Sequence, residues 1–95
     1  MSFDAAVATL RSWIGRDVVV EVRPDGTMME GALAERDDSG DPAFFTVDPY
    51  DTTGVAIALF GDGVRSAVLE GETLTIEQGR MTLVVTCGGR RSARE

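Results

Sequence analysis

The sequence predicts a mainly β fold, a small barrel of five to seven antiparallel strands with an N-terminal α-helix. Short runs in which apolar and polar residues alternate follow one another between clusters of turn-forming residues, as expected for an all-β domain. A stretch with helical spacing precedes them. At 95 residues the chain has the length of one domain. We expect that domain to cover residues 1–87, and residues 88–95 to form a flexible tail that contains arginine.

The helix is predicted between Ser2 and Gly15. Ser2 is a suitable N-cap, and Asp4 lies in the first turn, where the helix dipole favours an anion. Apolar residues recur along one stripe at helical spacing: Phe3, Val7, Leu10 and Ile14, with Ala6 on the same side and Trp13 at its edge. This stripe should be buried, and we expect the helix to lie across one end of the barrel.

Residues 17–35 predict a first hairpin. Alternate residues of both strands share the inner face: Val18, Val20 and Val22, then Met29, Gly31 and Leu33. A Pro-Asp-Gly turn at residues 24–26 joins the two strands. Gly31 lies inside a strand, where glycine is unusual. It indicates either a sharp bend that lets one strand serve both sides of a small barrel, which we favour, or close backbone packing.

Further alternating runs predict four more strands: Phe44–Asp48, Val55–Phe60, Glu72–Glu77 and Met81–Thr86. The last two form a second hairpin with Leu74, Ile76, Met81, Leu83 and Val85 inward, and with Thr73, Thr75 and Glu77 outward. Residues 55–60 are apolar on both faces, which indicates a central strand or one covered by a partner. Residues 64–69 fit either a strand or a 3₁₀ turn, with Val64, Ala67 and Val68 inward.

Residues 3–36 carry a resemblance to a known family. A helix is followed by Trp13-Ile14-Gly15-Arg16-Asp17-Val18-Val19-Val20-Glu21-Val22, then by Asp25-Gly26, and then by Glu30-Gly31-Ala32-Leu33. This order resembles the opening of the Sm-like (LSm, Hfq-related) superfamily of SH3-like small β-barrels. The resemblance implies a strongly bent barrel capped by the helix, and it implies RNA binding and ring assembly as expectations. Asp38-Ser39-Gly40 stands in place of the family's Met-Asn, and Val64-Arg65-Ser66 is weakly similar to its Ile-Arg-Gly.

The composition is acidic. Asp and Glu number 16 against 9 basic residues, all of them Arg, which gives a net charge of −7. Such a charge disfavours non-specific binding to nucleic acid or an anionic membrane, because that binding depends on cationic contacts. The residue usage is typical of a GC-rich bacterial genome. No apolar run is long enough to cross a bilayer, and the N-terminal residues do not resemble a secretory signal, so we expect a cytoplasmic protein.

Few groups of the chain are suited to catalysis. The chain lacks His, and its single Cys, Cys87, can form neither an intrachain disulfide nor a multi-cysteine zinc site. Phosphate-binding glycine motifs do not occur. We therefore predict a protein that is not an enzyme, without catalytic, cofactor-binding or metal-binding residues. Although Arg90 and Arg91 follow it, Cys87 is interpreted as an incidental thiol at a fraying strand end.

Two sets of residues have both a functional and a structural interpretation. Asp37, Asp38 and Asp41 cluster in one polar loop, but they lack the spacing of a calcium-binding loop and are interpreted as solvated. The aromatic residues offer platforms for base stacking but are expected mainly to fill the core: Trp13, Phe44, Phe45, Tyr50 and Phe60.

These observations predict a non-enzymatic protein-interaction or structural module, which either self-associates or binds another protein. Residues 55–60 are the expected surface for strand addition. The alternative is an Sm-like RNA-binding regulator that uses Arg65 or the tail residues Arg90, Arg91 and Arg94.

Overall fold

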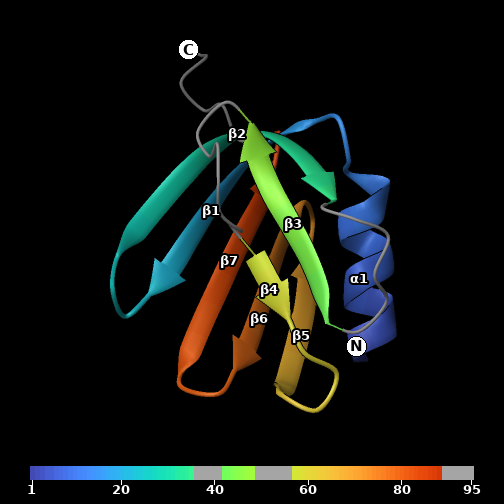
Figure 1. The fold of residues 1–95 in the computed structure, drawn as a ribbon, viewed down its shortest axis with the longest axis vertical. Helices are drawn as coiled ribbons and strands as arrows, with labels where there is room; N and C mark the ends of the chain where they lie inside the picture. The colour runs from blue at the N-terminus through green and yellow to red at the C-terminus, as the bar shows by residue number, and fades with distance from the viewer. Residues whose placement is uncertain (36–41, 49–56, 89–95) are drawn as a thin grey trace.

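The computed structural model describes residues 1–35, 42–48 and 57–88 of the chain (Figure 1). One helix, α1 (Phe3–Ser12), is followed in these residues by seven strands. The strands are β1 (Asp17–Arg23), β2 (Thr27–Glu35), β3 (Ala43–Asp48), β4 (Ile57–Leu59), β5 (Val64–Glu70), β6 (Thr73–Gln78) and β7 (Met81–Cys87). The predicted mainly β class with an N-terminal helix is confirmed.

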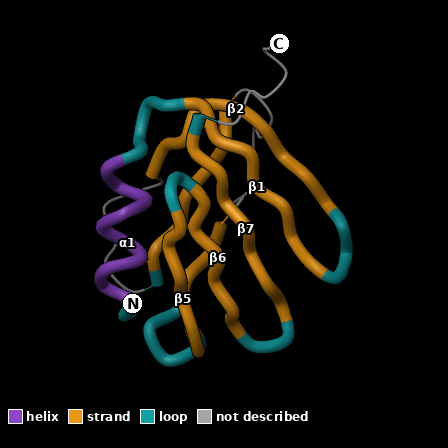
Figure 2. The backbone as a smooth tube through the Cα atoms, turned by 180° about the vertical axis from the view of Figure 1, so that it is seen from behind, coloured by secondary structure: helices purple, strands orange, loops and turns teal. Residues whose placement is uncertain are grey.

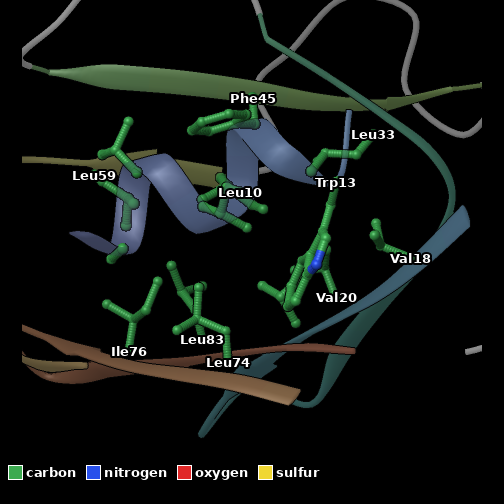
Figure 3. Close-up of a cluster of buried hydrophobic side chains, with 14 of the residues drawn as sticks. Leu10, Trp13, Val18, Val20, Leu33, Phe45, Leu59, Leu74, Ile76 and Leu83 are labelled. Carbon is green, nitrogen blue, oxygen red and sulfur yellow. The ribbon is translucent and has the colours of Figure 1, made fainter. Parts of the chain in front are cut away.

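All the described strands belong to one antiparallel sheet with the order β4-β3-β2-β1-β7-β6-β5. The sheet curls, so that β3 and β4 lie in front of β7 and β6 in the view of Figure 1. Apolar side chains fill the space between the two layers of strands and the helix (Figure 3). The predicted small barrel is thus present as a single curled sheet with β4 and β5 at its two ends.

Strand β2 carries the sheet from one layer to the other. Its residues 27–32 pair with β1, and its residues 32–35 pair with β3. Gly31 is buried and directly precedes Ala32, the residue that pairs with both neighbours. Figures 1 and 2 show β2 as a strongly bent strand. The bend expected from the mid-strand glycine is therefore present.

Helix α1 begins as the sequence predicts and ends earlier. The Ser2 hydroxyl accepts a hydrogen bond from the Ala5 backbone N–H at 3.1 Å, which confirms the N-cap. The helix ends at Ser12, so Trp13 becomes the C-cap residue and is buried, 7% exposed. Ile14 lies beyond the helix and is 42% exposed, so its predicted place in the buried stripe is wrong.

The helix lies along one side of the curled sheet in both Figures 1 and 2, and not across an end as expected. At its start the Met1 amine donates to the Ala67 carbonyl of β5 at 2.7 Å. Near its end Arg11 forms an ion pair with Glu35 of β2, with Nη2 and Oε2 2.9 Å apart. The helix therefore bridges β5 and the end of β2, and it covers the core on that side.

The core combines the inner face of the sheet with one stripe of the helix. Its largest fully buried side chains come from six strands and α1: Leu10, Val18, Val20, Leu33, Phe45, Val47, Ile57, Leu59, Leu74, Ile76 and Val85. Figure 3 shows several of them converging from opposite layers. Complete burial of a side chain of this size contributes roughly 1.5–3 kcal/mol, so this cluster dominates the stability of the fold.

Two strand residues predicted to face inward, Met81 and Val68, are exposed. Met81 is 43% exposed because it is the first residue of β7, beside the turn that joins β6 to β7. Residues 64–69, for which the sequence allowed either a strand or a 3₁₀ turn, lie in strand β5. Its register shifts between Val64 and Ser66, so that Ala67 faces the core and Val68 faces outward, 50% exposed.

Strand β4 is an end strand among the described strands, so the first alternative for residues 55–60, a central strand, is wrong, and cover by a partner stays a prediction. The described strand covers Ile57–Leu59, and residues 55 and 56 lie outside the described part of the chain. Ile57 and Leu59 are fully buried, whereas Phe60 is 43% exposed. The curl of the sheet brings this end strand over the core, which explains its apolar residues.

A buried glutamine links β4 to the opposite half of the sheet. Gln78, the last residue of β6, is only 7% exposed. Its Oε1 accepts a hydrogen bond from the Phe60 backbone N–H at 2.7 Å, and its Nε2 donates to the Ala58 carbonyl at 2.8 Å. The side-chain amide therefore supplies a donor to β4 and an acceptor to the residue that follows it, as a neighbouring strand would.

Candidate interaction surface

Five adjacent strands, β2-β1-β7-β6-β5, present one continuous surface on the side opposite the core. Cross-strand partners place its side chains in rows. One row is Met28, Glu21, Val84, Thr75 and Val68, and the next is Glu30, Val19, Thr86, Thr73 and Glu70. We call these two rows the outer face. At about 4.8 Å between neighbouring strands, each row spans at most about 19 Å.

The outer face arises from the same alternation that builds the core. Along β6 the inward residues Leu74 and Ile76 alternate with Thr73 and Thr75, and β-branched residues such as threonine favour the strand conformation. Figure 2, which views the molecule from behind, shows no described helix or strand in front of β1, β7 and β6. The outer face is therefore uncovered by the described residues.

The outer face carries the most exposed large apolar side chains of the described chain. Met28 is 59% exposed and Val68 is 50% exposed, and both belong to the same row, one on β2 and the other on β5. Between them in this row lie Glu21, Val84 and Thr75, all partly buried by their neighbours. The centre of the outer face thus offers methyl groups and hydroxyls for contact.

The charges of the outer face are negative. Its two rows hold three glutamates and no basic residue. Glu21 has a cationic neighbour, because its Oε2 lies 3.3 Å from Nε of Arg23. Glu30 and Glu70, at the two ends of the second row, form no ion pair among the described residues. Negative charge therefore stands at both ends of a row whose middle is neutral.

The single thiol is placed differently from the prediction. Cys87 lies in β7, paired with Val18 of β1, and is 2% exposed, so it belongs to the core and not to a fraying end. Burial raises the pKa of the Cys87 thiol, Arg16 lowers it and Glu72 raises it. A buried thiol with a raised pKa has little thiolate at neutral pH, which agrees with the interpretation as a non-reactive side chain.

The aromatic residues divide between core and surface. Trp13 and Phe45 are buried as expected. Phe44 and Phe60 stack edge to face, with ring centroids 6.5 Å apart, and Phe60 is partly exposed. Tyr50 lies outside the described residues. The structure thus places two of these rings in the core and brings two others together beside β4.

Arg65, the residue expected to support RNA binding, is engaged with its own hairpin. Its Nη2 donates to the Gly79 carbonyl at 2.8 Å, and its Nη1 lies 3.9 Å from Oε1 of Glu77. The loop aspartates and the tail arginines lie outside the described residues: Asp37, Asp38, Asp41, Arg90, Arg91 and Arg94.

Within residues 1–35, 42–48 and 57–88, no three Cys, Asp or Glu side chains are grouped so that they could hold a metal ion. No helix in that part of the chain has the length and apolar character needed to span a membrane. Comparison with protein-family models, curated proteins and solved structures gave no match to this chain.

Proposed function

We propose that this chain is a non-enzymatic protein-interaction module and that the outer face is its contact surface. The observation that carries the proposal is the exposure of Met28 and Val68 on a sheet face that no described element covers. Exposed apolar side chains gain free energy when a partner removes them from water. The fold itself does not bury these two side chains, because the core lies on the other side of the same strands.

The chemistry of the outer face suits contact. Threonine and valine methyl groups contribute apolar area, and threonine hydroxyls and glutamate carboxylates provide hydrogen-bonding groups around it. The one thiol of the chain lies on the opposite side of the sheet, inside the core. The thiol is thus not accessible to a partner, and we expect binding to use the exposed groups of the outer face.

The proposal is tested by capturing a partner from a cell lysate with the original chain and with two matched variants. Combining Met28→Ser with Val68→Ser removes both exposed apolar side chains and leaves the charge unchanged. Ile14→Ser removes a comparably exposed apolar side chain outside the outer face. We expect the original chain and Ile14→Ser to retain the same protein and the double variant to lose it. A chain that retains no protein and is a strict monomer by light scattering contradicts the proposal.

Self-association is a second form of this proposal, supported by the end strand β5. Among the described strands β5 pairs only with β6, and its residues Val68 and Leu69 are 50% and 39% exposed. Exposed edge strands can pair with another chain. A molar mass that rises with concentration in light scattering, and that falls back in Leu69→Lys, supports this form. A constant monomer mass contradicts it.

An Sm-like relationship is proposed for the fold alone. The N-terminal helix, the bent β2 and the curled sheet support it. The associated RNA-binding alternative has less support, because Arg65 is engaged with Gly79 and Glu77. Titration with uridine-rich RNA at low salt tests it: salt-sensitive binding favours the RNA-binding alternative, and its absence excludes it.

A further inference from the structure

We propose that the outer face docks a basic protein segment, one with Arg or Lys side chains at both ends of an apolar stretch, laid across the strands from β2 to β5. This inference rests on the function proposed above and adds the chemistry of the partner.

The second row of the outer face carries the charge pattern. Glu30 on β2 and Glu70 on β5 stand at its ends, separated by Val19, Thr86 and Thr73 on the strands between them. Neither carboxylate has an ion-pair partner among the described residues. A segment with cations at both ends would pair with both carboxylates while its middle contacts the methyl groups between them. Such complementarity favours association and selects among partners.

The same charges disfavour the other occupants of this surface. A second copy docked face to face would place two sets of Glu21, Glu30 and Glu70 across one interface, and like charges across an interface oppose association. Nucleic acid meets the same carboxylates with its phosphates, and the cations next to the two rows, Arg23 and Arg65, are paired with Glu21 and Glu77. A basic protein segment is the partner that fits both the charged ends and the apolar middle.

The size of the row sets the length of the segment. Five strands at about 4.8 Å spacing span at most about 19 Å, which an extended chain covers with about six residues at about 3.3 Å each. Contact limited to two rows is small compared with a stable protein interface. We therefore expect weak association that declines as salt screens the charges.

An NMR titration of the full isotope-labelled chain provides the direct test. The probe is a peptide of about six residues, with Arg at each end and Val and Thr between, and its control has Glu in place of each Arg. We expect the Arg peptide to shift the backbone signals of Val19, Thr73 and Thr86 at low salt, and the shifts to decline at high salt. The Glu peptide should leave these signals unchanged.

Matched charge variants localise the effect. Combining Glu30→Gln with Glu70→Gln should weaken binding of the Arg peptide by roughly threefold to tenfold, as expected for two exposed ion pairs. Combining Asp25→Asn with Asp62→Asn removes the same charge from two exposed turns outside the outer face. This second variant should bind within about twofold of the original chain, because those turns do not contact the segment.

The outcomes separate this inference from the proposed function. Any of four results overturns the basic partner. The Arg peptide does not bind at low salt, the Glu peptide binds the same residues equally well, uridine-rich RNA does so, or both charge variants weaken binding equally. If the lysate protein is lost from the Met28→Ser, Val68→Ser chain but kept by the Glu30→Gln, Glu70→Gln chain, the interaction module stands and the basic partner is excluded. If the original chain captures no protein and stays monomeric, the proposed function itself fails.

Discussion

The two faces of the same strands differ in what the fold requires of them. On the inner face of β6 and β7, Ile76 and Leu83 are 0% and 3% exposed and are packed in the core. On the outer face their sequence neighbours Thr75 and Val84 are only partly buried, and no described element covers them. The inner face is explained by folding alone. The composition of the outer face is not fixed by packing, so it is where a binding function can reside.

The largest expected effect comes from truncating the inner face. Ile76→Ala should lower the free energy of unfolding by about 2–5 kcal/mol, because it leaves a cavity among fully buried side chains. Thr75→Ala, one residue away on the outer face, should change it by about 1 kcal/mol or less. Urea unfolding followed by the fluorescence of Trp13, the single tryptophan, measures both. Equal losses in the two variants would remove the distinction between the faces.

The glutamine that links β4 to β6 should have the next largest effect. Gln78→Met keeps much of the side-chain volume but leaves the Phe60 N–H and the Ala58 carbonyl without their partner. We expect a loss of about 1–3 kcal/mol in the free energy of unfolding. Glu77→Gln, which changes the partly exposed neighbour on the outer side, serves as the control and should change the free energy of unfolding by about 0.5 kcal/mol or less. A neutral Gln78→Met would show that the two hydrogen bonds do not hold β4.

Ionisation of the buried Cys87 thiol should have a smaller effect on stability, and this effect depends on pH. The pKa of Cys87 is raised in the folded chain from an ordinary value of 9.0. Because the folded state holds its proton more tightly than the unfolded state, the stability due to this group is fully present below the ordinary pKa and is lost as the pH rises above it. Relative to Cys87→Ala, the original chain should therefore lose stability only above about pH 9. A difference that changes between pH 6 and pH 8 contradicts this placement.

Much of the fold follows from local patterns. Alternation predicted the inner residues of β1, β2, β6 and most of β7, and the glycine in β2 indicated its bend. The errors have local causes that alternation does not report. A register shift in β5 turned the Val68 side chain outward. Because the helix ends early, Ile14 is exposed and Trp13 is buried. The curl of the sheet places an end strand over the core, so that strand is as apolar as a central one.

The candidate surface was harder to predict than the fold. The sequence placed Thr73 and Thr75 on the outer side of their strand, but it did not indicate which residues of other strands lie beside them. The row from Glu30 to Glu70 joins residues far apart in the chain, and it depends on the pairing of β1 with β7. The buried role of Gln78 was missed for the same reason, because its partners lie on β4 and in the turn after it.

The central claim, that a partner covers the outer face, is tested most directly by carboxyl footprinting of the chain in buffer and in lysate. Chemical labelling of exposed carboxylates reports which of them a bound partner protects. We predict reduced labelling of Glu30 and Glu70 in lysate, with labelling of Asp25 and Asp62 in the exposed turns unchanged. Unchanged labelling at all four positions, or protection of Asp25 and Asp62 instead, would contradict the claim.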